Sequence, residues 1–244
     1  MRLPPPSVRD DLPVNRGLRI ASVALITAGL VVVADVVATL TWKEPVSSAY
    51  GSIQQGRAED QLNDLEDRFP ARPDLREVAG PGGVRRKVHD LAGLFKKRIH
   101  DGQAIGRIAI PSIGLDVVAV QGTDTADLET GPGHYADTPL PGRGGTTAFA
   151  GHRTTYLAPF RDLDALEPGY EIDVEMPYGN FQYRVTGSRI VEPSQVGIVR
   201  DVGHEQLVLT ACHPLYSAAQ RIAVFARLTK VSFFALGGRR WRDP

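Results

Sequence analysis

The second half of the chain is divided into short strand-like segments, and this pattern limits the folds that it can adopt. Turn residues separate seven segments with β-branched or alternating apolar residues, at 104–110, 116–121, 146–151, 170–176, 181–191, 206–211 and 221–228. Residues 178–180 are expected to close a hairpin, and only 123–128 and 159–166 have helical character. We therefore expect a mostly β fold of about 125 residues, built as a closed barrel or a sandwich.

An apolar run near the N-terminus indicates a membrane segment. Residues 20–42 read IASVALITAGLVVVADVVATLTW, which is long enough to cross a bilayer core of about 30 Å as a helix. Arginines dominate the residues before it, so the N-terminus is expected in the cytoplasm and everything after Trp42 outside. A cleaved signal peptide is the alternative, because acceptable cleavage sites end at Ala34 and Ala38. A retained single-pass anchor is favoured, since the apolar character continues past both sites.

These features divide the chain into five parts. We expect a cytoplasmic tail (1–19), a transmembrane anchor (20–42), an extracytoplasmic helical and linker segment (43–103), a catalytic barrel (104–230) and a C-terminal tail (231–244).

Within the third part, 48–69 and 84–99 are predicted helices, separated by a breaker-rich linker at 70–83. The apolar positions of the first helix are Tyr50, Ile53, Leu62, Leu65 and Phe69. The apolar face of the second is expected to consist of Val88, Leu91, Leu94 and Phe95.

Charge and cysteine content exclude two classes of function. The 28 basic and 28 acidic side chains cancel, whereas a nucleic-acid-binding protein usually carries a clear basic excess. Cys212 is the only cysteine, and His213 follows it. No second Cys/His pair supplies further ligands at finger-like spacing, so zinc is not expected. No acidic cluster indicates calcium either.

Cys212 is the strongest candidate for chemistry. A lone thiol cannot form an intramolecular disulfide, so it is either a small buried side chain or a reactive group. It follows an apolar strand and precedes Pro214, which places it where a strand gives way to a loop. His152 ends another strand and Arg221 begins a third. At one barrel rim, the histidine would transfer protons and the arginine would stabilise an oxyanion.

Three motifs in order resemble the sortases, the membrane-anchored cysteine transpeptidases of Gram-positive cell envelopes. GRIAIPSIGLDVVAVQGTDTADLETGPGHY resembles the opening of the sortase barrel, TTAFAGHRTTY the segment of the catalytic histidine, and LTACHPLYSAAQR the cysteine-to-arginine segment. The resemblance covers residues 106–228. The Cys-His-Pro-x-Tyr-Ser-Ala sequence is most similar to that of class E, the housekeeping type of high-GC Gram-positive bacteria.

The resemblance implies an eight-stranded β-barrel that cleaves a C-terminal sorting signal, LAxTG in class E or LPxTG elsewhere, between threonine and glycine. Cys212 would form a thioester with the secreted protein, His152 would act as general acid and base, and Arg221 would hold the oxyanion or the peptide. The acceptor would be an amine of a peptidoglycan precursor, and no cofactor is implied. Neighbouring residues that would contact the substrate are Thr210, Ala211, His213, His134 and Tyr135.

The sequence departs from the family pattern at one place. Sortases usually have the sequence Thr-Leu-x-Thr-Cys, which ends at the nucleophile. This chain has Val208 and Ala211 in place of the two threonines. The hydroxyl missing at Ala211 is expected to weaken contacts with the substrate threonine.

Other readings remain open. L,D-transpeptidases have an arginine two residues after the cysteine, whereas Arg221 comes nine positions after Cys212. In NlpC hydrolases the cysteine precedes the histidine, whereas His152 precedes Cys212 here. Both differences count against those families. The remaining alternative is an inactive or divergent sortase-like binding module, which predicts an unreactive Cys212.

Overall fold

The computed structural model describes residues 16–41, 45–68 and 82–232, which belong to two compact units, Met1–Lys43 and Glu44–Pro244. The described part of the first unit is one helix, α1 (Arg16–Thr41). Its residues Gly17–Val37 are long and apolar enough to cross a membrane, and none of them is buried within the protein. The helix also includes residues 16–19, which the sequence assigned to the tail. Trp42 and most of the predicted linker lie outside the described residues.

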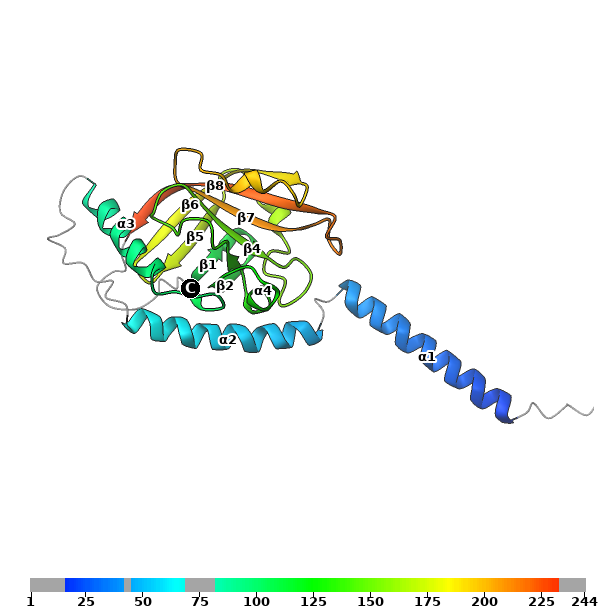
Figure 1. The fold of residues 1–244 in the computed structure, drawn as a ribbon. Helices are drawn as coiled ribbons and strands as arrows, with labels where there is room; N and C mark the ends of the chain where they lie inside the picture. The colour runs from blue at the N-terminus through cyan, green and yellow to red at the C-terminus, as the bar shows by residue number, and fades with distance from the viewer. Residues whose placement is uncertain (1–15, 42–44, 69–81, 233–244) are drawn as a thin grey trace, which may run out of the picture. The chain divides into compact units, whose positions relative to one another are not determined.

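The second unit contains the expected eight-stranded barrel (Figure 1). The order of the strands around the closed sheet is β1-β2-β3-β4-β7-β8-β6-β5. Their bounds are β1 (Ala104–Ile110), β2 (Leu115–Gln121), β3 (Gly133–His134), β4 (Thr146–Gly151), β5 (Glu171–Met176), β6 (Gly179–Val191), β7 (Gln206–His213) and β8 (Gln220–Ser232). Seven of these match predicted strands within a few residues. The two-residue β3 was missed, because a strand this short has no readable periodicity.

One side of the barrel combines parallel and antiparallel pairing. Strand β4 runs parallel to β7, and β7 runs antiparallel to β8. As a result, the C-terminal ends of β4 and β7 lie at the same edge, where β8 begins. A histidine, a cysteine and an arginine that are far apart in the sequence are thereby placed on three neighbouring strands.

Strand β7 is buried on both faces, which explains its nearly continuous apolar sequence. Leu207, Leu209 and Ala211 belong to the main core inside the barrel. Val208 belongs to a second cluster on the opposite face, and Tyr135 packs against that cluster. The other members of the second cluster are Ala148, Ala223 and Phe225, with Ile198 and Val199 packed against them.

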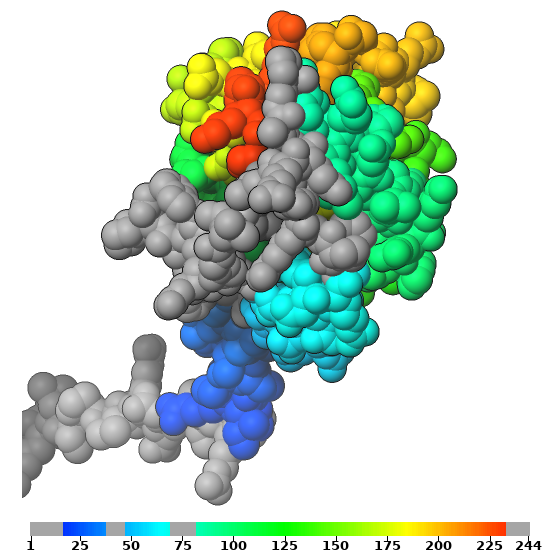
Figure 2. All heavy atoms as spheres, turned by 90° about the vertical axis from the view of Figure 1, so that its left-hand side faces the viewer, coloured from blue at the N-terminus to red at the C-terminus, as the bar shows by residue number. Residues whose placement is uncertain are grey.

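Helices and short turns cover the barrel. They are α2 (Pro45–Arg68), α3 (Gly83–Lys96), α4 (Thr125–Thr130) and the 3-10 turns η1 (Pro111–Ile113), η2 (Leu163–Ala165) and η3 (Val196–Val199). Helix α2 runs along the barrel beside α4, β1 and β2 (Figure 1), and α3 contacts the barrel beside β8, on the face shown in Figure 2. The predicted helix at 159–166 is reduced to η2.

The buried faces of two helices differ from the predicted ones. In α3 the buried residues are Val88, Leu91, Ala92 and Phe95, whereas Leu94 is 49% exposed. Leu94 lies about 100° around the helix from Phe95, outside the stripe that the others form.

In α2 the buried residues Gly51, Ala58 and Leu62 form the contact face, and Tyr50 and Ile53 are exposed. Leu62 is thus buried as predicted and Leu65 packs against the main core, while the small residues Gly51 and Ala58 let the helix approach the barrel closely.

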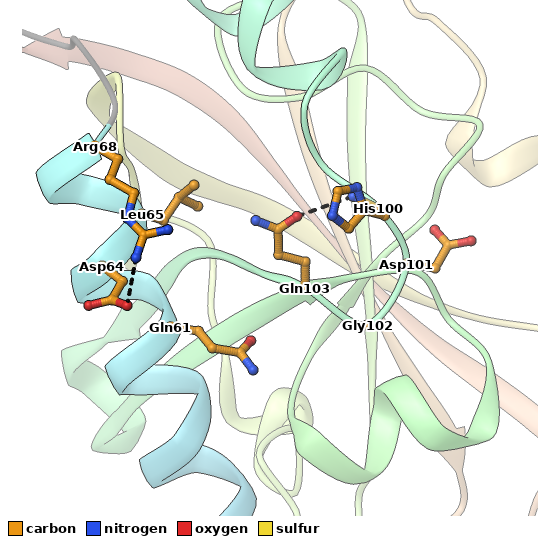
Figure 3. Close-up of a pocket in the computed structure, with 8 residues that line it drawn as sticks. All are labelled: Gln61, Asp64, Leu65, Arg68, His100, Asp101, Gly102 and Gln103. Atoms are coloured by element: carbon orange, nitrogen blue, oxygen red, sulfur yellow. Dashed lines mark hydrogen bonds and ion pairs between the residues drawn. The ribbon is translucent and has the colours of Figure 1, made fainter.

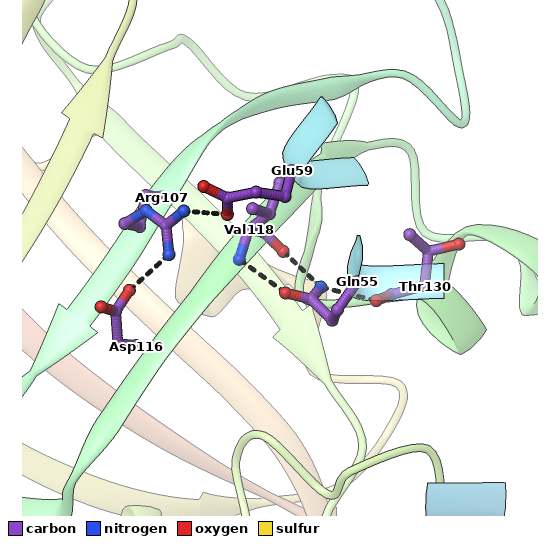
Figure 4. A network of polar contacts seen from close by, with 6 residues as sticks. All are labelled: Gln55, Glu59, Arg107, Asp116, Val118 and Thr130. Carbon is purple, nitrogen blue, oxygen red and sulfur yellow. Dashed lines mark hydrogen bonds and ion pairs between the residues drawn. The ribbon is translucent and has the colours of Figure 1, made fainter. Parts of the chain in front are cut away.

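Polar contacts fasten α2 to the barrel (Figure 4). The side-chain amide of Gln55 accepts from the backbone N–H of Val118 at 2.8 Å and donates to its carbonyl at 2.9 Å and to the Thr130 carbonyl at 2.6 Å. Arg107 on β1 forms ion pairs with Glu59 of α2 and with Asp116. Helix α2 is therefore part of the barrel domain.

Candidate active site

The strand register brings the three predicted catalytic residues to one edge of the barrel. Gly151 pairs with Ala211 between β4 and β7, so His152 and Cys212 each come one residue after that pair. Cys212 pairs directly with Arg221 across β7 and β8. All three side chains are partly exposed. The positions predicted from the ends and beginnings of strands are thus adjacent in space.

Cys212 and Arg221 share the face of the sheet that points away from the main core. Directly opposed residues of an antiparallel pair project to the same side, and the preceding Ala211 points into the core. The Nη1 of Arg221 donates to the carbonyls of Ala218 and Gln220, each at 2.9 Å. No carboxylate of the described residues forms an ion pair with this guanidinium, which leaves its charge available for a substrate.

His152 lies in surroundings that favour its neutral form. Burial lowers the pKa of His152, and the charge of Glu129 opposes this shift in part. Its Nε2 is buried and has no hydrogen-bond partner among the described residues. A neutral imidazole with an unpaired ring nitrogen is suited to exchange a proton with a thiol or an amine.

The loop after His152 has an unusual backbone. Tyr156, Leu157 and Ala158 have φ angles of 49°, 65° and 45°, the left-handed region that costs about 1–2 kcal/mol per non-glycine residue. The loop is closed by a hydrogen bond from the Phe160 N–H to the His152 carbonyl at 3.0 Å. Such strain persists only where surrounding contacts hold it, and it concentrates at functional sites.

Arg153 connects the loops that follow β4 and β7, and sequence reasoning gave it no role. Arg153 is only 2% exposed, and its Nη2 lies 2.8 Å from Oδ1 of Asp164. Nε and Nη2 donate to the Arg161 carbonyl, and Nη1 donates to Nδ1 of His213 at 3.2 Å. Because arginine only donates, Nδ1 of His213 is the acceptor in this contact. The only sequence signal was an arginine beside the candidate histidine.

The predicted substrate-binding residues fall into separate environments. The hydroxyl of Tyr135 lies 2.9 Å from Oγ1 of Thr210, on the face of β7 that also holds Cys212. His213 is partly exposed and directly follows Cys212.

His134 differs from these neighbours, because it is fully buried. Its Nδ1 lies 3.0 Å from Gln121, its Nε2 lies 3.1 Å from Thr138, and burial lowers its pKa to about 3. His134 therefore belongs to the interior and not to a surface that a substrate reaches.

Ala211 also differs from its expected placement. The residue is 3% exposed and packs in the main core. A hydroxyl at this position would point into the barrel, away from the face that carries Cys212. The expectation that Ala211 affects the substrate threonine by direct contact is therefore wrong.

Two cavities among the described residues lie away from the residues at this edge. One of about 410 Å³ lies between the C-terminal half of α2 and the turn before β1, lined by Gln61, Asp64, Leu65, Arg68 and residues 100–103 (Figure 3). The other, of about 310 Å³, lies beside α3 and Glu205. Among the described residues, no group of three His, Cys, Asp or Glu side chains could hold a metal ion.

Comparison with known proteins gives the same assignment as the geometry. A sortase domain matches residues 108–229. Sortase D of Bacillus subtilis is 38% identical over 115 residues, which are 46% of this chain and 56% of that protein. Sortase SrtE1 of Streptomyces coelicolor is 29% identical over 145 residues, 53% of this chain and 41% of that protein. The chain thus spans about half the length of these relatives.

The fold comparison includes a class E enzyme. A solved structure of sortase E1 from Streptomyces coelicolor has a TM-score of 0.52 and 28% identity, and the match covers 54% of this chain and 91% of that one. The predicted similarity to class E is therefore confirmed, alongside similarity to a class D enzyme. With half of the chain matched by the sortase domain and the three motif residues assembled at one edge of the barrel, the chain belongs to the sortase family.

Proposed function

We propose that this protein is a membrane-anchored transpeptidase that cleaves a C-terminal sorting signal between threonine and glycine and joins the protein to an amine of a cell-wall precursor. The observation that carries the proposal is the direct pairing of Cys212 with Arg221, with His152 at the end of the neighbouring strand. This arrangement supplies a nucleophile, a proton-transfer group and a fixed cation on one face.

In the first half-reaction, Sγ of Cys212 attacks the carbonyl carbon of the signal's threonine and its proton passes to His152. The guanidinium of Arg221 stabilises the negative oxygen of the tetrahedral intermediate. The carbon–nitrogen bond to glycine then breaks, and His152 returns the proton to the departing amine. The product is a thioester on Cys212 and a neutral histidine.

In the second half-reaction, an amine of the acceptor attacks the thioester. His152 accepts the proton that the amine loses, the carbon–sulfur bond breaks, and the proton returns to the sulfur of Cys212. Both half-reactions require a neutral histidine at the start, in accord with the burial that lowers the pKa of His152. No group beyond the chain's own residues is needed for this chemistry.

The substrate is proposed to be an extended peptide of the LAxTG or LPxTG type on the face of β7 that carries Cys212. The described sortase E1 structure has a tripeptide in its active site, which supports a peptide ligand for a relative with this barrel. On that face, the partly exposed Tyr135 is proposed to contact the peptide, with its hydroxyl held by the buried Thr210. His213, which ends β7 and is partly exposed, is proposed to contact the peptide at the strand end. Helix α1 is proposed to keep the barrel at the outer surface of the cell membrane.

Quenched fluorescent peptides carrying LAxTG or LPxTG test the proposal with the full-length protein in detergent micelles. Each peptide is incubated with and without triglycine as amine acceptor, and Cys212→Ala is the control. We expect cleavage between threonine and glycine that requires Cys212, with the product joined to triglycine when it is present. Absence of cleavage with a thiol that iodoacetamide still alkylates would indicate a different substrate. A thiol that does not react would favour a binding module.

A further inference from the structure

We propose that Tyr156 is a positioning residue for His152 and that helix α2 completes the active site by holding Tyr156 in place. The inference rests on the proposed role of His152 and extends it to residues that take no part in the chemistry. Neither Tyr156 nor any residue of α2 would touch the reacting atoms. They would instead set the orientation of the imidazole that does.

The ring of Tyr156 lies against the imidazole. The two ring centroids are 5.2 Å apart, with a 40° angle between the planes. The phenol hydroxyl donates to Oε1 of Glu129 on α4 at 3.0 Å. Glu129 is also the charge that partly opposes the burial of His152. The phenol ring is thus fixed at its outer end while its face limits the rotation of the imidazole.

The N-terminal half of α2 supports Tyr156 from the other side. Oγ of Ser47 accepts a hydrogen bond from the backbone N–H of Tyr156 at 3.4 Å, and the ring of Tyr50 meets that of Tyr156 edge-on at 6.1 Å. At Gly51 the backbone of the helix lies close to the loop. A Cβ atom added there would lie 3.0 Å from Cγ of Leu157 and 3.1 Å from the carbonyl carbon of Tyr156.

Glycine at position 51 lowers the stability of the helix, and the close contact with the loop explains why a glycine is present there. A glycine inside a helix is less favourable than alanine, and Gly51 has no left-handed backbone to require it. Its lack of a side chain instead lets α2 lie against residues 156–157. Those residues begin the left-handed run that ends at Ala158, a conformation that needs external support.

Together these contacts form a chain from α2 to the catalytic histidine. Ser47 and Gly51 follow soon after the end of α1 at Thr41, so the segment that leaves the predicted anchor is the one that supports Tyr156. The barrel without α2 would keep Cys212, His152 and Arg221 but would lose the support of the loop between β4 and β5. A fragment that begins at Gly83 is therefore expected to be a poor enzyme.

The first test compares Tyr156→Ala with Tyr156→Phe in the full-length protein in micelles. The alanine variant removes the ring, and we expect kcat for peptide cleavage to fall more than tenfold while KM stays within twofold. The phenylalanine variant keeps the ring and loses only the bond to Glu129, so we expect most of kcat to be retained. Rescue by phenylalanine separates ring packing against His152 from a general loss of stability.

The second test observes His152 directly, without turnover. The protein is labelled with 15N-histidine, and the His152 resonances are assigned from the spectrum of His152→Ala. We expect them to shift in Tyr156→Ala, because the ring current of the phenol is lost, and to stay near their original positions in Tyr156→Phe. This readout remains valid if the wild-type protein cleaves neither peptide, so failure of the proposed function is distinguishable from failure of the positioning role.

The contribution of α2 is tested at two glycines of the same helix. Gly51→Leu forces a side chain against residues 156–157, whereas Gly56 has no neighbouring atom within 4 Å of an added Cβ, so Gly56→Leu is the matched control. We expect Gly51→Leu to lower kcat and move the His152 resonances as Tyr156→Ala does, and Gly56→Leu to change neither. Gly51→Ala, with a smaller clash, serves the same purpose if the leucine variant does not fold. Unchanged kcat and unchanged His152 resonances in Tyr156→Ala and the Gly51 variants would overturn the proposal.

Discussion

Cys212 and Arg221 are direct cross-strand partners on β7 and β8, although they are nine positions apart in the sequence. The loop between these strands returns the chain so that the thiol and the guanidinium project from the same face. The geometry depends on the hairpin and not on any contact between the two side chains. In the proposed mechanism, this pairing would give the guanidinium a fixed position relative to an acyl group on the sulfur.

Arg221→Lys is expected to lower kcat/KM for peptide cleavage at least tenfold. Lysine keeps the positive charge but lacks the planar fork of nitrogens, so it cannot hold the loop carbonyls and an oxyanion in the same way. Steady-state kinetics with the fluorescent peptides measure the effect. Arg227→Lys, further along the same strand, is the control and should retain full activity. Turnover within twofold of wild type in Arg221→Lys would reduce Arg221 to a structural role.

Arg153→Ala is expected to destabilise the barrel by about 2 kcal/mol, because a buried guanidinium with several charge-assisted hydrogen bonds is lost. The variant also frees His213, so cleavage should fall even at temperatures where the protein is folded. Thermal unfolding monitored by circular dichroism measures the stability. Arg184→Ala breaks an exposed ion pair with Glu171 and should cost less than about 1 kcal/mol. Equal effects of the two variants would contradict the structural role of Arg153.

The lowered pKa of His134 leads us to expect that the folded protein loses stability in mild acid. Its pKa in the folded protein is about 3, below its ordinary value of 6.5, so between these values the unfolded chain binds a proton that the folded chain does not. The stabilising contribution is present in full above pH 6.5 and declines as the pH falls toward 3, by up to about 5 kcal/mol.

Unfolding in urea at several pH values between 6.5 and 4.5 measures this decline before most carboxylates titrate. His134→Gln should flatten the pH dependence. A slope unaffected by His134→Gln would show that other groups cause it.

Gln55→Leu tests whether α2 is a structural part of the barrel. The substitution leaves the N–H and carbonyl of Val118 and the carbonyl of Thr130 without the amide partner that they have now. We expect a loss of about 1–3 kcal/mol and a fall in kcat, because α2 also supports the loop after His152. Gln61→Leu, at an exposed position of the same helix, should change stability by less than about 0.5 kcal/mol.

The sequence predicted those features that leave a regular pattern in it, such as the alternation of apolar residues in a strand. Alternation located seven of the eight strands, and the ends of those strands located His152, Cys212 and Arg221. Arg153 and Tyr156 could not be found in this way, because their roles depend on contacts with residues distant in the chain. Tyr156 meets His152 through a left-handed turn that its Tyr-Leu-Ala sequence does not suggest.

Burial likewise could not be predicted for individual polar residues. His134 has the same turn-rich, polar surroundings in the sequence as a binding-site residue, yet the pairing of β3 with both β2 and β4 places it in the interior. Ala211 was expected beside the substrate because it neighbours Cys212. Alternation along β7 instead directs the two side chains to opposite faces.

The most direct measurement is the mass of the intact protein after mixing with a sorting-signal peptide in the absence of an amine. The proposed mechanism predicts an added mass equal to that of the peptide up to and including its threonine, less one water, located on Cys212 and released as an amide when triglycine is added. The adduct should be absent in Cys212→Ala and should form more slowly in Tyr156→Ala. Peptide cleavage with no adduct on Cys212, or cleavage that persists in Cys212→Ala, would contradict the thioester mechanism.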